Sequence, residues 1–265
     1  MLLLRHGQST ANAEDSFSGW VDVPLSVRGE QEARSAAAVM RSSGLLPSVV
    51  HTSLLQRAVR TAAIVMRELD RPEVPVHRSW RLNERHYGAL QGRSRAAVLA
   101  EVGEETFVRW RRSYEGRPPA GPPEGHAATA ADPRYAHLPP GCVPNGESLS
   151  DVQRRLLPYW QDALAGDVAA GRLPLVVAHG NSLRALCTIL DGLDAEEVKS
   201  LNIPTGVPLL YELDEHWRPE IRGGVYLNPE AAERGRAEVA AQGRGKGSGP
   251  DGTSDQAYGS ISCCQ

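Results

Sequence analysis

The chain opens with the stretch Leu2-Leu3-Leu4-Arg5-His6-Gly7-Gln8-Ser9-Thr10-Ala11-Asn12, in which a run of leucines ends abruptly at an Arg-His-Gly triplet. Such a run is typical of a buried parallel strand, and ligands bind at the carboxyl ends of these strands in open α/β sheets. A neutral imidazole at His6 is a nucleophile suited to phosphoryl transfer, and the Arg5 guanidinium can hold an oxyanion beside it. An isolated Arg-His-Gly also fits a structural histidine behind a core strand, so the rest of the chain has to decide.

A second apolar run repeats this pattern far along the sequence. Residues 173–182 read LPLVVAHGNS, which is an apolar strand, a His-Gly pair and polar residues that begin a helix. Because parallel strands end at the same edge of a sheet, we expect His6 and His179 to face one another across a gap of phosphate size. The helix that begins near Asn181 adds its N-terminal amides to this anion site.

Helices and strands alternate around these two runs. A helix is predicted over residues 28–42 with Ser26 as its cap, and strands over residues 48–52, 75–80 and 208–213. A helix capped by Ser53 follows the strand at 48–52 and carries Arg57 on its first turn. Arg57 points into the crevice of His6 if the strands are neighbours, although its spacing also fits a surface arginine. The alternation predicts an α/β domain around a parallel sheet.

Residues 82–92, LNERHYGALQG, form a second cluster of ionisable and hydrogen-bonding side chains. Glycines bound the cluster, and this composition is typical of a loop that forms a site. Glu84 is the candidate general acid and base, because moving a phosphoryl group to or from a hydroxyl requires a carboxylate that takes and returns one proton. A single glutamate is also often a salt-bridge partner.

The remaining sequence predicts supporting elements. Helical segments are expected over residues 95–102 and 104–112, and the second ends in Arg111 and Arg112, which can reach one trianionic ligand from different sides. Residues 115–145 are rich in proline and glycine and are expected to form an irregular excursion, either a lid or a packing loop. A long helix is expected from Ser148 to about Ala170. Residues 1–228 are expected to form the catalytic domain and residues 229–265 a largely disordered tail.

Composition excludes several classes of function. The chain has 29 basic and 32 acidic residues and a formal net charge of −3, which provides no general attraction to nucleic acid or to an anionic membrane. The four cysteines show no CxxC spacing, so we expect free thiols in a reducing compartment. The sequence has neither a signal peptide nor an apolar run of about 18 residues, which predicts a cytoplasmic protein.

Together the motifs resemble the cofactor-dependent phosphoglycerate mutases of the histidine phosphatase superfamily. The matching stretches run in order from residue 2 to about residue 228; they are LRHG at 4–7, FSGW at 17–20, TSLLQRA at 52–58, LNERHYGALQG at 82–92, WRR at 110–112, DPRY at 132–135 and HGNSLRA at 179–185. Arg-His-Gly marks only the superfamily, whereas residues 83–92 and 110–112 are specific to the mutase branch.

The resemblance implies a three-layer α/β/α fold with a mostly parallel central sheet, and a homo-oligomer, either a dimer or a tetramer. It implies a reaction between 3-phosphoglycerate and 2-phosphoglycerate that 2,3-bisphosphoglycerate primes and that needs no metal. His6 would carry the phosphoryl group, Arg5, Arg57 and His179 would hold its oxygens, and Glu84 would relay the proton. The implied substrate-binding positions are Arg5, His6, Gly7, Gln8, Ser9, Thr10, Ala11, Asn12, Ser18, Gly19, Arg57, Glu84, Arg85, His86, Tyr87, Arg95, Arg111, Arg112, Gly180 and Asn181.

Some positions depart from the family's pattern, and two other functions are compatible with parts of the sequence. Gln8 stands in place of the usual Glu, Ala11 in place of an aromatic residue, Ser18 in place of Thr and Arg95 in place of Lys. One alternative is a phosphatase of the same superfamily, which Arg111 and Arg112 disfavour because it needs no second anion site. The other is a phospho-ligand binding module without turnover, which the presence of both His6 and Glu84 disfavours.

Overall fold

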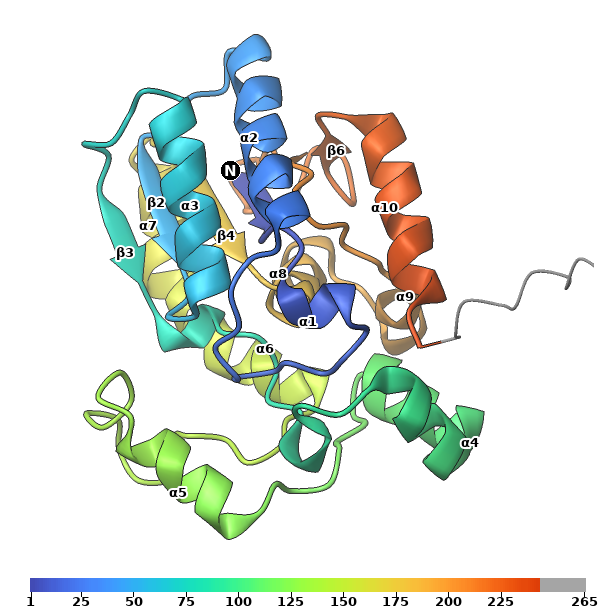
Figure 1. Ribbon diagram of the computed structural model, residues 1–265. Helices are drawn as coiled ribbons and strands as arrows, with labels where there is room; N and C mark the ends of the chain where they lie inside the picture. Colours follow the sequence, from blue (N-terminus) through green and yellow to red (C-terminus); the bar gives the residue numbers. More distant parts are fainter. Residues whose placement is uncertain (244–265) are drawn as a thin grey trace, which may run out of the picture.

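A single mixed sheet forms the centre of the molecule (Figure 1). The computed structural model describes residues 1–243 of the chain. The sheet has the strand order β3-β2-β4-β1-β5-β6, and its strands are β1 Leu2–Arg5, β2 Val49–Thr52, β3 Val76–Arg78, β4 Pro174–Ala178, β5 Leu209–Leu210 and β6 Val225–Tyr226. The first four strands pair in parallel, and β5 and β6 add an antiparallel edge. The predicted strand at 208–213 is therefore only two residues long.

Helices cover both faces of the sheet. They are α1 Thr10–Ala13, α2 Val27–Ser42, α3 Gln56–Glu68, α4 Arg95–Arg112, α5 Pro123–Ala131, α6 Leu149–Tyr159, α7 Ala165–Ala169, α8 Gly180–Asp191, α9 Ala195–Ser200 and α10 Pro229–Ala241. Short 3₁₀ turns span Trp80–Leu82 and Gly88–Leu90, and a π-turn spans Trp160–Leu164. In Figure 1, α2 and α3 lie against one face of the sheet and α6 against the other. The three-layer α/β/α prediction is confirmed.

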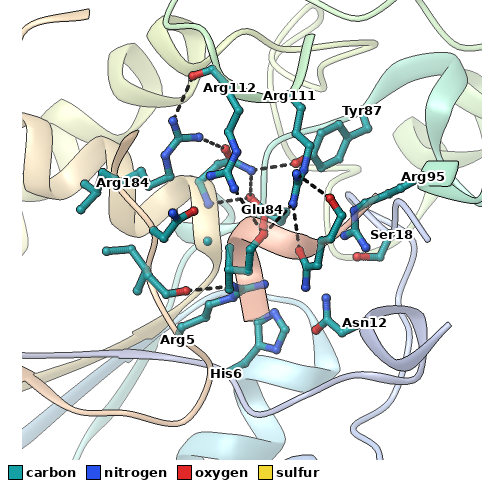
Figure 2. Close-up of a pocket in the computed structure, with 17 residues that line it drawn as sticks. Arg5, His6, Asn12, Ser18, Glu84, Tyr87, Arg95, Arg111, Arg112 and Arg184 are labelled. Atoms are coloured by element: carbon teal, nitrogen blue, oxygen red, sulfur yellow. Dashed lines mark hydrogen bonds between the residues drawn. The ribbon is translucent and has the colours of Figure 1, made fainter. Parts of the chain in front are cut away.

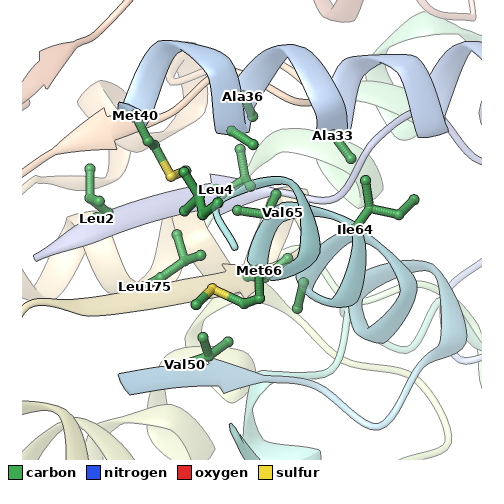
Figure 3. Close-up of a cluster of buried hydrophobic side chains, with 14 of the residues drawn as sticks. Leu2, Leu4, Ala33, Ala36, Met40, Val50, Ile64, Val65, Met66 and Leu175 are labelled. Atoms are coloured by element: carbon green, nitrogen blue, oxygen red, sulfur yellow. The ribbon is translucent and has the colours of Figure 1, made fainter. Parts of the chain in front are cut away.

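The leucines of β1 divide between the two cores. Leu2 and Leu4 pack with Ala33 and Met40 of α2 in the first core, which Figure 3 shows. Leu3 packs on the opposite face with residues of α6 and α8. Successive side chains of a strand point to opposite faces, so an unbroken apolar run is what a strand covered on both sides requires. The contribution of α2 to the first core is mainly small alanines, which allow this helix to lie close to the sheet.

Several predicted boundaries hold and others are wrong. The Ser26 and Ser148 side chains cap α2 and α6, as their sequence context predicts. Gly103 has φ 76° and interrupts α4, which agrees with two helical segments. The predicted long helix to about Ala170 is confirmed, because α6, the π-turn and α7 follow one another without a gap. The excursion at 115–145, expected to be irregular, contains α5. None of the helices within residues 1–243 has the length and apolar character needed to cross a bilayer.

The region expected to form a disordered tail begins with a helix. Asn228 caps α10 through a bond from Ala231, and Ala232 and Val239 are buried. The expectation of disorder from residue 229 is therefore wrong for α10. The helix was not predicted because its buried side chains are small and few. Its apolar pattern is therefore weak. Residues 244–265 of the predicted tail lie outside the described residues, and the boundary at residue 228 stays a prediction.

Candidate active site

A pocket opens at the carboxyl ends of β1 and β4, where the two His-Gly pairs lie. Its lining includes eleven of the residues that the sequence selected: Arg5, His6, Asn12, Ser18, Glu84, Tyr87, Arg95, Arg111, Arg112, Gly180 and Asn181. Figure 2 shows Glu84 between His6 and Arg5 on one side and Arg111 and Arg112 on the other. Segments from four parts of the chain therefore meet at the sheet edge that parallel topology predicts.

His6 is oriented by a local hydrogen bond. Its Nδ1 lies 2.7 Å from the carbonyl oxygen of Gly7, and a carbonyl only accepts, so Nδ1 carries the proton. Nε2 is then the nitrogen with a free lone pair. Burial, together with the positive charges of Arg57 and Arg5, holds the pKa of His6 well below its ordinary value. The side chain is therefore a neutral imidazole near pH 7, which is the form that acts as a nucleophile.

His179 lies directly beside His6, with the two ring centroids 4.9 Å apart. Its Nε2 is 2.8 Å from the Ser53 hydroxyl, which also accepts a hydrogen bond from the backbone N–H of Leu55. Ser53 therefore orients His179 and does not cap α3, contrary to the sequence prediction; the cap position is Leu55, without a side-chain bond. If the hydroxyl donates to Nε2, Nδ1 of His179 carries the proton, and this buried atom has no partner.

Two buried arginines complete the surroundings of His6. Arg57 is 1 % exposed and donates to the backbone carbonyls of Val21 and Gly19, while Arg5 donates to the carbonyl of Ile203. The Nε atoms of Arg57 and Arg5 are buried without a partner, like Nδ1 of His179. Unpaired buried polar atoms are costly, and an anion that reaches the donors among them would satisfy them. These orphaned donors around a neutral imidazole fit a phosphoryl group.

Glu84 is held through one of its two oxygens. Oε1 accepts hydrogen bonds from the backbone N–H of Arg85 at 2.8 Å, the backbone N–H of Asn181 at 3.1 Å and Nδ2 of Asn181 at 3.0 Å. Oε2 has no hydrogen bond within the described residues and lies near Gly180, whose added Cβ would be 3.7 Å from Oε2 and 3.5 Å from Cζ of Arg5. The two oxygens therefore have different environments, and Oε2 is the one available for proton transfer.

The far wall of the pocket is a group of cations in contact with α10. Arg111 donates to the carbonyl oxygens of Gln242 and Val239 and to the side chain of Gln242, and Arg112 donates to Val239. Carbonyls at the end of a helix have no partner within the helix, so these arginines also stabilise α10. Arg95 pairs with Asp15 at 2.9 Å. No three His, Cys, Asp or Glu side chains of residues 1–243 are grouped to hold a metal ion.

Comparison with known proteins identifies the family of this chain. A sequence model of the histidine phosphatase superfamily (branch 1) matches residues 1–136 and 123–218. The chain belongs to the histidine phosphatase superfamily.

Relatives and solved structures extend this assignment. The chain is 54 % identical over 244 residues to a 2,3-bisphosphoglycerate-dependent phosphoglycerate mutase of Thermobifida fusca, which covers 92 % of this chain and 99 % of the relative. A protein of the same name from Streptomyces avermitilis is 52 % identical over 93 % of this chain and 97 % of its own length. The structure of a mycobacterial glucosyl-3-phosphoglycerate phosphatase superposes with a TM-score of 0.60 and 26 % identity, covering 79 % of this chain and 92 % of the phosphatase.

Ten residues of the set implied by this superfamily do not line the pocket. They are Gly7, Gln8, Ser9, Thr10, Ala11, Gly19, Arg57, Arg85, His86 and His179. The ring centroid of His179 lies 4.9 Å from that of His6, and the charge of Arg57 acts on both histidines. The Gln8 side chain accepts a hydrogen bond from Ser26, and Ser9 caps α1. The guanidinium carbon of Arg85 lies over the ring of Tyr87, 4.6 Å from its centroid. Gln8, Ser9 and Arg85 therefore contact other protein groups outside the pocket lining.

Six residues that line the pocket were not predicted as site residues from the sequence. They are Arg184, Leu201, Asn202, Ile203, Val239 and Gln242. The spacing of Arg184, one helical turn after Asn181, was a usable signal, because side chains three apart share a helix face. The others lie in the segments 201–203 and 239–242, where no polar cluster or motif marks a site. Only the docking of these segments over the pocket identifies them.

Proposed function

We propose that this chain is a 2,3-bisphosphoglycerate-dependent phosphoglycerate mutase, which interconverts 3-phosphoglycerate and 2-phosphoglycerate through a phosphohistidine at His6. The observation that carries the proposal is the 52 to 54 % identity, over nearly the whole chain, to proteins named for this activity. The reaction belongs to glycolysis and gluconeogenesis, so we place the protein in the cytoplasm. We also propose a homo-oligomer, a dimer or a tetramer, as the family resemblance implies.

His6 is the proposed nucleophile. Its Nε2 forms a bond to phosphorus while the bond from phosphorus to the leaving oxygen breaks. The orphaned donors of Arg5, Arg57 and His179 are suited to bind the three equatorial oxygens, over which negative charge is spread in the transition state. Because these donors are buried and fixed, they need no reorganisation when the charge develops. 2,3-Bisphosphoglycerate supplies the phosphoryl group that first loads His6.

Glu84 is the proposed proton relay. When His6 takes the phosphoryl group from an alkyl ester, the leaving oxygen needs a proton, and we infer that Oε2 of Glu84, which accepts no hydrogen bond within the described residues, gives it. In the reverse transfer the same oxygen takes the proton from the attacking hydroxyl. Transfer of the phosphoryl group to either hydroxyl of a glycerate gives the two isomers. One carboxylate therefore serves both directions.

The cations opposite His6 support a mutase. A bisphosphate intermediate has one phosphate at His6 and needs a second anion site at its other end, and Arg95, Arg111 and Arg112 provide one. The alternative is a phosphatase, in which water attacks the phosphohistidine, and the superposed mycobacterial phosphatase belongs to this class by name. Its 26 % identity is well below that of the mutase relatives. A binding module without turnover does not account for the presence of both His6 and Glu84 in one pocket.

The test is conversion of 3-phosphoglycerate to 2-phosphoglycerate by purified protein, with and without 2,3-bisphosphoglycerate, while released phosphate is followed in the same samples. We expect isomer formation that depends on the bisphosphate, little free phosphate, and a His6→Ala variant with neither activity. Phosphate release without isomer would establish the phosphatase alternative. Absence of any label on His6 from radioactive bisphosphate would favour the binding module.

A further inference from the structure

Arg184 of α8 is a buried arginine that lines the pocket, and both of its terminal nitrogens are bonded to other protein groups. The residue is 4 % exposed. Its Nη1 donates to Oδ1 of Asn181 at 2.9 Å, and its Nη2 donates to the backbone carbonyls of Arg112 at 3.0 Å and Val198 at 2.6 Å. Both terminal nitrogens are therefore engaged with the protein. The Nε atom of Arg184 is buried without a partner, like those of Arg5 and Arg57.

The contact to Arg184 fixes the orientation of the Asn181 amide. A guanidinium has only donors, so the Asn181 atom that faces it must be the oxygen. The amide nitrogen is then turned the other way, where it donates to Oε1 of Glu84 at 3.0 Å and to the Tyr87 hydroxyl at 3.0 Å. A flipped amide would place its NH₂ against the guanidinium and its oxygen against the carboxylate. Arg184 excludes that arrangement.

The Asn181 amide adds a third N–H group to the two backbone N–H groups that mark Oε1 of Glu84 as the acceptor oxygen. With the amide held, Oε1 accepts three N–H groups and Oε2 stays free on the side of Arg5. An ionised Glu84 would orient the amide by itself, but a protonated Glu84 would not, because its hydroxyl could donate to the oxygen of a flipped amide. Arg184 is therefore needed in the half of the cycle in which Glu84 holds the proton.

We propose that Arg184 is a positioning residue for proton transfer, which locks the Asn181 amide so that Glu84 gives and takes the proton through Oε2. This inference rests on the proposed function only in its use of Glu84 as the proton relay. The step is balanced by His6: its Nε2 bonds to phosphorus, the ester bond breaks, and the Oε2 proton passes to the leaving oxygen. The Asn181 amide and Arg184 exchange no proton in this step.

The leaving group of the ester tests the proposal. Nitrophenolate leaves without a proton, whereas the alkoxide of a glycerate does not, so only the second needs Glu84. We expect Arg184→Met to slow phosphorylation of His6 by 2,3-bisphosphoglycerate roughly tenfold, the loss of about one charge-assisted hydrogen bond, and to leave phosphorylation by 4-nitrophenyl phosphate within about twofold. Glu84→Gln should show the same selectivity with a larger loss.

Controls separate positioning from stability. Leu186→Ala opens a cavity in the core on the same helix without a contact to Asn181, so it should affect the two esters equally. Arg184→Met should add nothing to Asn181→Ala, because the arginine acts through that amide. If Arg184→Met does not fold, Arg184→Lys retains the charge and can give only part of the contact, so it should show the same selectivity in weaker form.

Two outcomes overturn the proposal: an equal loss with both esters, or losses that add in the double variant. Failure of the mutase assignment looks different, because wild-type protein would then be labelled by 4-nitrophenyl phosphate and not by 2,3-bisphosphoglycerate. In that case 3-phosphoglycerate replaces the bisphosphate as the alkyl ester. The ratio of its rate to that of the nitrophenyl ester, in wild type and Arg184→Met, then decides the role of Arg184.

Discussion

At the scale of single residues, the pocket is a buried group of cations around one carboxylate. Burial lowers the pKa of Arg57 to about 10 and that of Arg111 to about 9, and like charges nearby contribute to the shift of Arg111. Glu84 is the only acidic residue among those that line the pocket. A ligand with several negative charges would offset this excess of positive charge. Burial and the charges of Arg57 and Arg5 lower the pKa of His6 and keep it neutral, so one arrangement serves both substrate binding and nucleophile activation.

The lowered pKa of His6 predicts the pH dependence of its phosphorylation. A histidine with its ordinary pKa near 6.5 would lose about tenfold in neutral fraction between about pH 7.5 and about pH 5.5. His6 has a pKa well below this value, so it should stay neutral over the range. We expect the rate constant for labelling by 4-nitrophenyl phosphate, measured by rapid quench, to change little. The Glu84→Gln background removes any contribution of the proton relay, and a tenfold decline there would contradict the prediction.

At the scale of elements, the loop after β1 is positioned by close contact with the first turn of α2. A Cβ on Gly29 would lie 2.0 Å from the carbonyl oxygen of Gln8, and a Cβ on Gly7 would lie 2.1 Å from the carbonyl oxygen of Gly29. These are backbone atoms that cannot rotate away. The backbone of α2 therefore packs directly against the loop that carries His6. Gly7 and Gly29 permit this close contact because they have no Cβ.

Gly29→Ala should therefore be harmful although it lies within a helix. We expect it to lower the free energy of unfolding by roughly 1–3 kcal/mol, because the backbone must shift, and to reduce the rate of His6 phosphorylation. Gly166→Ala in α7 is the matched control, since its Cβ would meet nothing within 4 Å. That change should raise stability by about 0.5–1 kcal/mol. Urea denaturation of both variants gives the comparison, and equal stability of the two would refute the contact argument.

The position of α10 leads to a second prediction at this scale. Removing residues 229–265 takes away the acceptors of Arg111 and Arg112 and the wall formed by Val239 and Gln242. We expect a rise in KM for phosphoglycerate and a roughly tenfold larger share of phosphohistidine lost to water, because water reaches the site. A chain that ends at Gly243 keeps α10 and is the control. Equal partition to water in the two truncated proteins would show that α10 does not shield the site.

At the scale of the whole molecule, several buried histidines make the fold sensitive to acid. Burial lowers the pKa of His6, His179 and His86, the last to about 4. The Gly88 backbone N–H donates to Nδ1 of His86, so that nitrogen must be unprotonated. Between about pH 4 and about pH 6.5 the unfolded chain binds more protons than the folded chain at these positions. The free energy of unfolding therefore falls as the pH drops below about 6.5.

His86 can be separated from the other groups by substitution. At about pH 4 its share of the loss is about 3 kcal/mol, by the shift of its pKa. Asn in place of His86 can accept the Gly88 hydrogen bond through Oδ1 and does not titrate, so His86→Asn should lose stability less steeply between about pH 6.5 and about pH 4.5. His137→Asn, at an exposed position, is the control. Thermal unfolding across this range measures the slopes, and identical slopes for wild type and His86→Asn would refute the assignment.

The sequence by itself determined the sheet edge and most of the chemistry placed there. The alternation of apolar and polar residues is local, so the strands before His6 and His179, the cap at Ser26 and the site loop around Glu84 could be read from short stretches. Because parallel strands end at the same edge of a sheet, the sequence alone predicted that the two histidines lie close together. The His6 and His179 ring contact in the structure agrees with this expectation.

Only the tertiary structure decided which atoms act and what covers them. Three features depend on hydrogen-bond partners that the sequence pattern does not reveal. They are the proton on Nδ1 of His6, the orientation of His179 by Ser53, and the orientation of the Asn181 amide by Arg184. Arg111 meets Gln242 across 131 positions of chain, and α10 has too few large apolar residues to reveal that contact. Local patterns encode elements, whereas the docking of distant segments depends on the shape and charge of the surfaces that the fold brings together.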